Sequence, residues 1–180
     1  MTQEVSGKNE GKQVKGLMTE VNAQIIRPAD TNAYIANDTI ADKTSGATII
    51  TFASVARRNG GGGYITGLRI GTNKDDFLSQ FRLHLFKTAP TVLSDNAPMT
   101  APLYADIASY LGHITLSTAI LQAASSAVFA QQDTTIEPPV AIPYMCADGS
   151  RDIYGMLETR IALTPASAQK FDIRMMIEVN

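Results

Sequence analysis

Residues 171–179 alternate strictly between two kinds of side chain, and this pattern restricts the fold more than any other feature. Apolar side chains recur at every second position, with polar or long side chains between them. A repeat of two is the period of a β-strand, whereas a helix repeats every 3.6 residues. The pattern therefore predicts a half-buried strand. Its inward face carries Phe171, Ile173, Met175, Ile177 and Val179.

Similar but shorter patterns recur along the chain from residue 17 onward. They are rich in Ile, Val, Thr and aromatic residues, as strands are, and turn residues separate them. Many short strands of this kind predict an all-β fold, a single β-sandwich or jelly-roll-like domain. The further predicted strands are 21–25, 47–55, 64–70, 81–86 and 153–163.

One segment has helical rather than strand periodicity. In residues 101–111, Leu103, Ile107, Tyr110 and Leu111 fall on one helix face. The pattern predicts one short helix of about three turns. Prolines crowd the stretch that follows, so residues 132–150 are expected to be a loop with little regular structure.

The first 16 residues differ from the rest of the chain. They hold lysines, glutamates and glycines but no aromatic residue, and the first aromatic is Tyr34. Such a segment cannot bury enough apolar surface to order itself. The expected organisation is an extended N-terminal arm at 1–16 and a sandwich domain at 17–180. The arm is either a frayed end or a segment that becomes ordered on a partner.

Charged residues make up 18% of the chain, against about 25% in an average soluble protein. Lys and Arg number 15 and Asp and Glu number 17, so the net charge is −2. That balance is too near neutral for a dedicated nucleic-acid binder. The hydrophobic fraction of 44% argues against general disorder. A surface short of charge fits a subunit that is covered by its neighbours.

The chain offers little for catalysis or metal binding. Its single cysteine, Cys146, rules out an internal disulfide and a multi-cysteine zinc site. Neither His84 nor His113 has a carboxylate or cysteine at a recognisable spacing. The turns around Asp75 and Asp152 lack the spacing of a calcium loop. We therefore expect no catalytic residue, no cofactor and no metal site.

The glycine run Gly60–Gly63 invites comparison with a phosphate-binding loop. Tyr64 follows it where a P-loop would have Lys and then Ser or Thr, and the spacing of a dinucleotide fingerprint is also missing. The expected role is a flexible hairpin or loop between two strands.

Basic residues are the best candidates for contact with a partner. They are Lys8, Lys12 and Lys15 in the arm and the adjacent pair Arg57 and Arg58. No aromatics are interleaved with them, so they do not form a nucleic-acid surface. The basic residues are either simply solvated or in contact with an acidic patch on a protein partner.

The N-terminus has no apolar core of a secretory signal, and no apolar run approaches the roughly 20 residues of a membrane helix. We expect synthesis in the cytosol and no membrane partner.

Three segments, taken in order, carry a family resemblance. The first runs from Ile26-Arg27-Pro28-Ala29-Asp30-Thr31 to Asp42, the second is Phe81-Arg82-Leu83-His84-Leu85-Phe86-Lys87-Thr88-Ala89-Pro90-Thr91, and the third runs from Ile153 to Ala168. In these segments the chain resembles the capsid cement, or decoration, proteins of tailed bacteriophages and prophages. The resemblance covers about residues 17–180, and its motifs are structural rather than catalytic.

The resemblance implies a virion structural protein that is not an enzyme. Such a protein would bind the outer surface of the major capsid lattice and stabilise the expanded head. The implied partners are the major capsid protein and further copies of the chain, with a trimer favoured and a dimer as the alternative. Other hypotheses remain: a head-fibre base, a neck or tail decoration, a receptor- or glycan-binding module, or an enzyme. On the cement hypothesis, strand faces rich in Thr and Ala, not charged ones, meet at subunit contacts.

Overall fold

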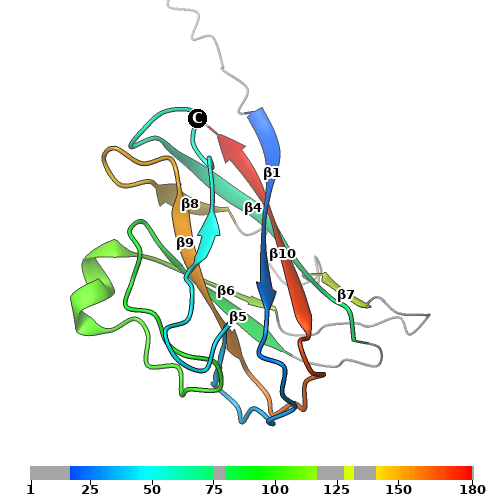
Figure 1. Ribbon diagram of the computed structural model, residues 1–180. Helices are drawn as coiled ribbons and strands as arrows, with labels where there is room; N and C mark the ends of the chain where they lie inside the picture. Colours follow the sequence, from blue (N-terminus) through cyan, green and yellow to red (C-terminus); the bar gives the residue numbers. More distant parts are fainter. Residues whose placement is uncertain (1–16, 75–79, 117–127, 132–140, 180) are drawn as a thin grey trace, which may run out of the picture.

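The structure is a computed structural model that describes residues 17–74, 80–116, 128–131 and 141–179. Two antiparallel sheets pack face to face as a sandwich, with one short helix beside them (Figure 1), which confirms the predicted all-β class. The predicted arm at 1–16 lies outside the described residues. Its boundary with the sandwich therefore stays a prediction.

The first sheet is built around the strictly alternating strand. That strand, β10 (Lys170–Val179), lies between β1 (Leu17–Ile26) and β4 (Gly62–Thr72). The far side of β4 pairs with two short strands, β7 (Val128–Gln131) and β8 (Ile142–Met145). β1 is therefore an edge strand of this sheet.

The second sheet is built around β9 (Ile153–Thr159) and β5 (Phe81–Phe86). β6 (Tyr110–Leu116) pairs with the far side of β5. On the other side of β9, two short strands pair with successive parts of it, β2 (Thr39–Ile40) and β3 (Ile50–Phe52).

The inward faces of the two sheets form the core. The five apolar side chains predicted for the inward face of β10 are each at most 4% exposed, which confirms the pattern. Across the sandwich, Phe81, Leu83 and Leu85 of β5 are buried against them. The rings of Phe81 and Phe171 meet edge to face with centroids 5.8 Å apart, a favoured geometry for aromatic pairs.

One short helix forms within the predicted segment 101–111, but its type and its extent differ from the prediction. The chain forms a short 3-10 helix, η1 (Tyr104–Ser109), and then enters β6 at Tyr110. The helical spacing fails because pairing with β5 takes the chain from Tyr110 onward, with Tyr110 opposite Phe86. Ile107, expected on the buried face, is 54% exposed.

No helix in the described ranges combines the length and apolar character needed to span a membrane.

The prediction of a loop over 132–150 is corrected in its second half. Residues 142–145 form β8, which pairs antiparallel with the start of β4. Pro143 is compatible with this place because an edge strand does not need every backbone N–H. Residues 132–140 lie outside the described part of the chain.

Candidate functional site

The predicted contact pair, Arg57 and Arg58, lies on the loop between β3 and β4. Both residues are exposed, and the loop is anchored on each side of them. The Ala56 N–H donates to Arg151 O at 3.3 Å, and the Gly60 N–H donates to Ser150 O at 2.8 Å. The arginines therefore project from a fixed support. The other three predicted contacts, Lys8, Lys12 and Lys15, lie outside the described residues.

The glycine run serves close strand packing. A Cβ on Gly62 would lie 2.3 Å from Tyr144 O, and one on Gly63 would lie 2.0 Å from Glu178 O. These glycines let β4 approach β8 and β10, and Gly62 and Gly63 belong to the strand β4 rather than to the expected flexible loop. The expected hairpin does not form, because β3 pairs with β9 in the other sheet.

An open pocket of about 370 Å³ lies where the glycine run meets β8. Tyr64, which is 41% exposed, and Arg58 contribute side chains to its lining. An aromatic ring beside a guanidinium group is a combination that can bind sugars or anionic groups. The sequence signalled the arginine but not the pocket, because β8 was not predicted.

The most exposed large apolar side chains of η1 were not predicted as contact residues. Tyr104 is 92% exposed and Ile107 is 54% exposed. They are three residues apart, so a 3-10 helix stacks them on one face. Figure 1 shows η1 standing out from the side of the sandwich. Two exposed apolar side chains on a protruding helical turn form a candidate protein contact.

The base of η1 is well anchored. The Lys87 N–H donates to Ser109 O at 2.8 Å, and the Ser109 hydroxyl donates to Asp106 O at the same distance. Directly after η1, the ring of Tyr110 packs on Phe86 with centroids 5.3 Å apart. The projecting pair therefore sits on a turn that is tied to β5.

A polar network covers part of the outward face of the second sheet. His84 Nε2 lies 2.9 Å from Glu158 Oε2, and Arg160 Nη1 lies 2.7 Å from Glu158 Oε1. The Tyr110 hydroxyl lies 3.1 Å from His84 Nδ1 and 3.1 Å from His113 Nδ1. This network was not predicted because its members come from β5, β6, β9 and the residue Arg160 beyond β9, and they pair at separations of up to 74 residues.

The hydrogen-bond roles in this network follow from Glu158. An ionised carboxylate can only accept, so His84 donates from Nε2 and accepts the Tyr110 hydroxyl proton at Nδ1. Burial lowers the pKa of His84, outweighing the hydrogen bond to Glu158. Burial alone would raise the pKa of Glu158, but hydrogen bonds from His84 and Arg160 outweigh it and lower this pKa. His84 is therefore a neutral imidazole that is hydrogen-bonded to the ionised carboxylate of Glu158.

This order of carboxylate, imidazole and hydroxyl resembles a catalytic triad in composition. A triad needs a nucleophile that is easily deprotonated. Burial instead raises the pKa of Tyr110, and its hydroxyl is shared with His113. The arrangement therefore suits a fixed polar network better than an activated nucleophile.

Cys146 and the histidines are not brought together. Cys146 belongs to the core, where burial raises the pKa of its thiol to about 11, while His84 and His113 face outward on the second sheet. Asp152 accepts the Ser54 N–H at 2.8 Å, which gives this carboxylate a structural role. Among the described residues, no group of three or more His, Cys, Asp or Glu side chains could hold a metal ion.

A second polar network is buried and joins three segments. Arg27 Nε donates to the Tyr34 hydroxyl at 2.6 Å, and this hydroxyl donates to Asp95 Oδ1 at 2.5 Å. Arg27 Nη2 lies 3.1 Å from Asp95 Oδ2, and the Ala41 N–H donates to Asp95 Oδ1 at 2.9 Å. The first segment of the family resemblance therefore holds a structural centre, with the Arg27 side chain fully buried.

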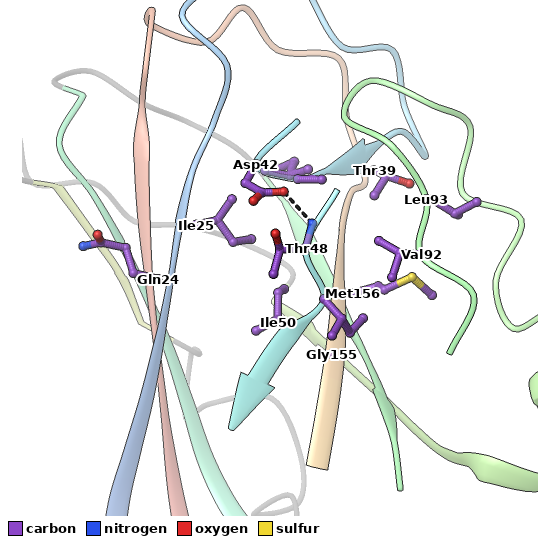
Figure 2. Close-up of a pocket in the computed structure, with 13 residues that line it drawn as sticks. Gln24, Ile25, Thr39, Asp42, Thr48, Ile50, Val92, Leu93, Gly155 and Met156 are labelled. Carbon is purple, nitrogen blue, oxygen red and sulfur yellow. Dashed lines mark hydrogen bonds between the residues drawn. The ribbon is translucent and has the colours of Figure 1, made fainter. Parts of the chain in front are cut away.

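A small pocket of about 130 Å³ lies between the edges of the two sheets (Figure 2). Gln24 and Ile25 of β1 line one side. Asp42, whose carboxylate accepts the Thr48 N–H at 2.7 Å, frames another side. The remaining lining is largely apolar and comes from β2, β3, β9 and residues 92–93, including Ile40, Ile50, Val92, Leu93 and Met156.

Comparisons with known proteins add little. No family model matches the chain, and no curated protein matches it by sequence. A chain from the structure of black queen cell virus is 13% identical, with a TM-score of 0.24, over 97% of this chain and 74% of that one. A chain from the structure of Triatoma virus is 12% identical, with a TM-score of 0.13, over 93% and 76%. Likeness this weak carries no argument about function.

Proposed function

We propose that this chain is a capsid cement protein of a tailed bacteriophage or prophage. In this proposal it binds the outer surface of the major capsid lattice, catalyses no reaction, and needs no cofactor, nucleic acid or membrane. The resemblance of the three sequence segments supports the family. The observation that carries the proposal is the exposed pair Tyr104 and Ile107 on the anchored turn η1. These apolar side chains would contact the capsid floor.

The proposed mechanism is stabilisation by mass action. A protein that binds only the expanded, assembled shell lowers the free energy of that shell. Several weak contacts suffice, because an oligomer on a repeating lattice gains effective concentration.

A rigid body serves this role. In the described residues, every buried side-chain nitrogen and oxygen has a hydrogen-bond partner. The Arg27 network joins the end of β1 to Tyr34, Ala41 and Asp95, and the Glu158 network links β5, β6 and β9 of the second sheet.

The basic residues would add contacts around this centre. Arg57 and Arg58 project from an anchored loop, and Lys8, Lys12 and Lys15 belong to the N-terminal segment. On the cement hypothesis they would meet acidic groups of the major capsid protein.

A binding test with capsids decides the proposal. Purified protein is mixed with expanded and with unexpanded capsids, and bound protein is measured after sedimentation. We expect binding to expanded capsids and higher thermal stability of those capsids. Binding to neither form would overturn the proposal. Removal of residues 1–16 should weaken binding while the sandwich keeps its circular dichroism spectrum, and equal binding would show that this segment makes no contact.

The open pocket beside Tyr64 and Arg58 supports a second candidate, a receptor- or glycan-binding module. Exposed aromatic rings at a concave site are typical of sugar recognition. Screening the protein against immobilised glycans tests this candidate. Glycan binding that is lost in Tyr64→Ser, without capsid binding, would favour it over the cement hypothesis. Binding to capsids also distinguishes a capsid cement from a neck, tail or head-fibre component.

A further inference from the structure

β1 has one edge without a strand partner in the described chain. It pairs with β10 along its full length, Leu17 opposite Val179 through Ile26 opposite Lys170, and no other described strand pairs with it (Figure 1). A ten-residue edge strand presents a row of backbone N–H and C=O groups that another strand can use.

The direction of these backbone groups follows from two hydrogen bonds between β10 and the β4 segment. The Lys170 N–H donates to Asn73 Oδ1 at 2.8 Å, and Met176 O accepts the Thr66 hydroxyl at 3.2 Å. The backbone N–H and C=O groups of even-numbered residues of β10 therefore point toward β4, and those of odd-numbered residues point toward β1. By the antiparallel register, odd-numbered residues of β1 bond to β10. The N–H and C=O groups of Met18, Glu20, Asn22, Gln24 and Ile26 consequently face the free edge.

The inward face of β1 is also incompletely covered. Ile25 at one end is 4% exposed, while Thr19, Val21 and Ala23 are only half buried. At the other end Leu17, on the same face, is 56% exposed. A strand added beside β1 would bury these partly exposed side chains on its inward face. The small pocket of Figure 2 opens beside Ile25, next to where such a strand would run.

We propose that β1 pairs antiparallel with β1 of a second copy of this chain, on a two-fold axis at Val21. The two first sheets then join into one continuous sheet. The strand that β1 supplies is complementary to itself. Met18 lies opposite Gln24 and Glu20 opposite Asn22 as backbone hydrogen-bonded pairs, with their side chains on the outward face. On the inward face Thr19 meets Ala23, Val21 meets its copy, and Leu17 lies opposite Ile25 at the pocket.

Neighbouring registers fit less well. Centring the pair one residue earlier, on Glu20, would keep the alternation of the free edge. It would, however, set two like charges directly opposite each other, which destabilises a sheet. Moving the axis to Asn22 would set Leu17 opposite Arg27, beyond the end of β1, and leave Ile25 facing Thr19. The axis at Val21 alone brings the exposed leucine to the apolar pocket.

The pairing deepens the cement proposal by selecting two-fold over three-fold symmetry, but it is tested without capsids. Sedimentation or light scattering of the full chain should show a dimer. A monomer at all concentrations would overturn the pairing, and so would a trimer. Neither result would bear on capsid binding, so the β1 pairing and the cement function can be overturned independently of each other.

A matched pair of variants tests whether the inward face of β1 makes the dimer contact. Leu17 and Met18 are adjacent and almost equally exposed, at 56% and 53%, but point to opposite faces. Leu17→Asp should weaken the dimer about tenfold or more, because the apolar side chain no longer meets Ile25. Met18→Asp should change the dimer dissociation constant less than about threefold. Equal effects of the two variants would overturn the inward-face contact.

A cysteine pair tests the register. Across the proposed axis, the two Val21 Cα atoms form a non-hydrogen-bonded pair about 4.5 Å apart, within disulfide range. Two Asn22 Cα atoms would be about 8–9 Å apart, which is too far. In a Cys146→Ala background, Val21→Cys should form covalent dimers on oxidation and Asn22→Cys should not. Crosslinking through Asn22→Cys alone would overturn this register.

Discussion

His84 and Glu158 lie 74 positions apart in the sequence, yet Nε2 of the ring meets Oε2 of the carboxylate at 2.9 Å. β5 and β9 pair so that Arg82 lies opposite Glu158 and His84 opposite Met156. The strand pairing thus places a nearly buried acid among three nitrogen donors. Arg160 and Arg82 approach the same carboxylate, at 2.7 and 3.6 Å.

Glu158→Gln should destabilise the sandwich. The amide keeps the shape of the side chain but removes the negative charge that His84, Arg82 and Arg160 share. We expect the free energy of unfolding to fall by about 2 kcal/mol, measured by urea denaturation. Glu20→Gln is the matched control, because Glu20 is exposed and 3.8 Å from Arg174, so its loss should cost less than about 0.5 kcal/mol. Equal losses would contradict a special role for Glu158.

The stability of the protein should fall in acid in two stages. Burial lowers the pKa of folded His84 below its ordinary 6.5, so the unfolded chain binds this proton more readily and acid favours unfolding. The contribution of His84 is complete above about pH 6.5 and is lost as the pH falls through the folded pKa. Glu158, whose pKa is lowered below 4.5, adds a second loss below about pH 4.5. Urea titrations at several pH values measure both.

His84→Gln separates the two stages. This variant should reduce the dependence of the unfolding free energy on pH below about pH 6.5, where His113, whose pKa burial also lowers, still contributes, and should leave the lower stage in place. An unchanged slope over that range would exclude His84 as its source.

Arg27→Ala should be among the most destabilising single changes. It would leave the buried Asp95 carboxylate without its guanidinium partner and the Tyr34 hydroxyl without a donor. Breaking a buried pair in this way costs about 3–5 kcal/mol. Thermal and urea unfolding measure the loss. Arg57→Ala, at an exposed loop position, should cost less than about 0.5 kcal/mol.

Gly63→Ala should destabilise the first sheet, because its Cβ would lie 2.0 Å from the backbone oxygen of Glu178. Overpacking of this kind costs about 1–3 kcal/mol. Gly67→Ala is the matched control on the same strand. Its Cβ would lie 3.3 Å from Met176 Sδ, at the flexible part of a side chain that can move. Melting temperatures of the two variants should therefore differ, and equal values would argue against steric packing at Gly63.

Tyr104→Ser should weaken binding to expanded capsids by about tenfold or more without changing the unfolding free energy. The ring is 92% exposed, so its loss costs the free protein little. Tyr64→Ser provides the comparison on a different surface. Capsid cosedimentation of both variants measures the effect, and equal binding by Tyr104→Ser and the unchanged chain would remove η1 from the proposed contact.

The local pattern predicted the elements whose two faces meet different surroundings. β10 is strictly alternating because one face is core and the other is mostly exposed. In β5 the alternation of Phe81, Leu83 and Leu85 marks the core face, although His84 and Phe86 are buried as well. The helix predicted at 101–111 is shorter in the structure because i, i+4 spacing does not reveal that Tyr110 pairs with Phe86 in a sheet. β8 was missed since prolines indicate loops, although an edge strand tolerates Pro143.

The amino-acid sequence alone determined the all-β class and the inward face of the last strand. These depend on local period and on side-chain size, which neighbouring residues express. Only the tertiary structure decided that Glu158 meets His84, that Asp95 meets Arg27, and that Tyr104 projects into solvent. Such contacts depend on strand order and register, which arise from packing the two sheets together and leave no fixed spacing in the sequence.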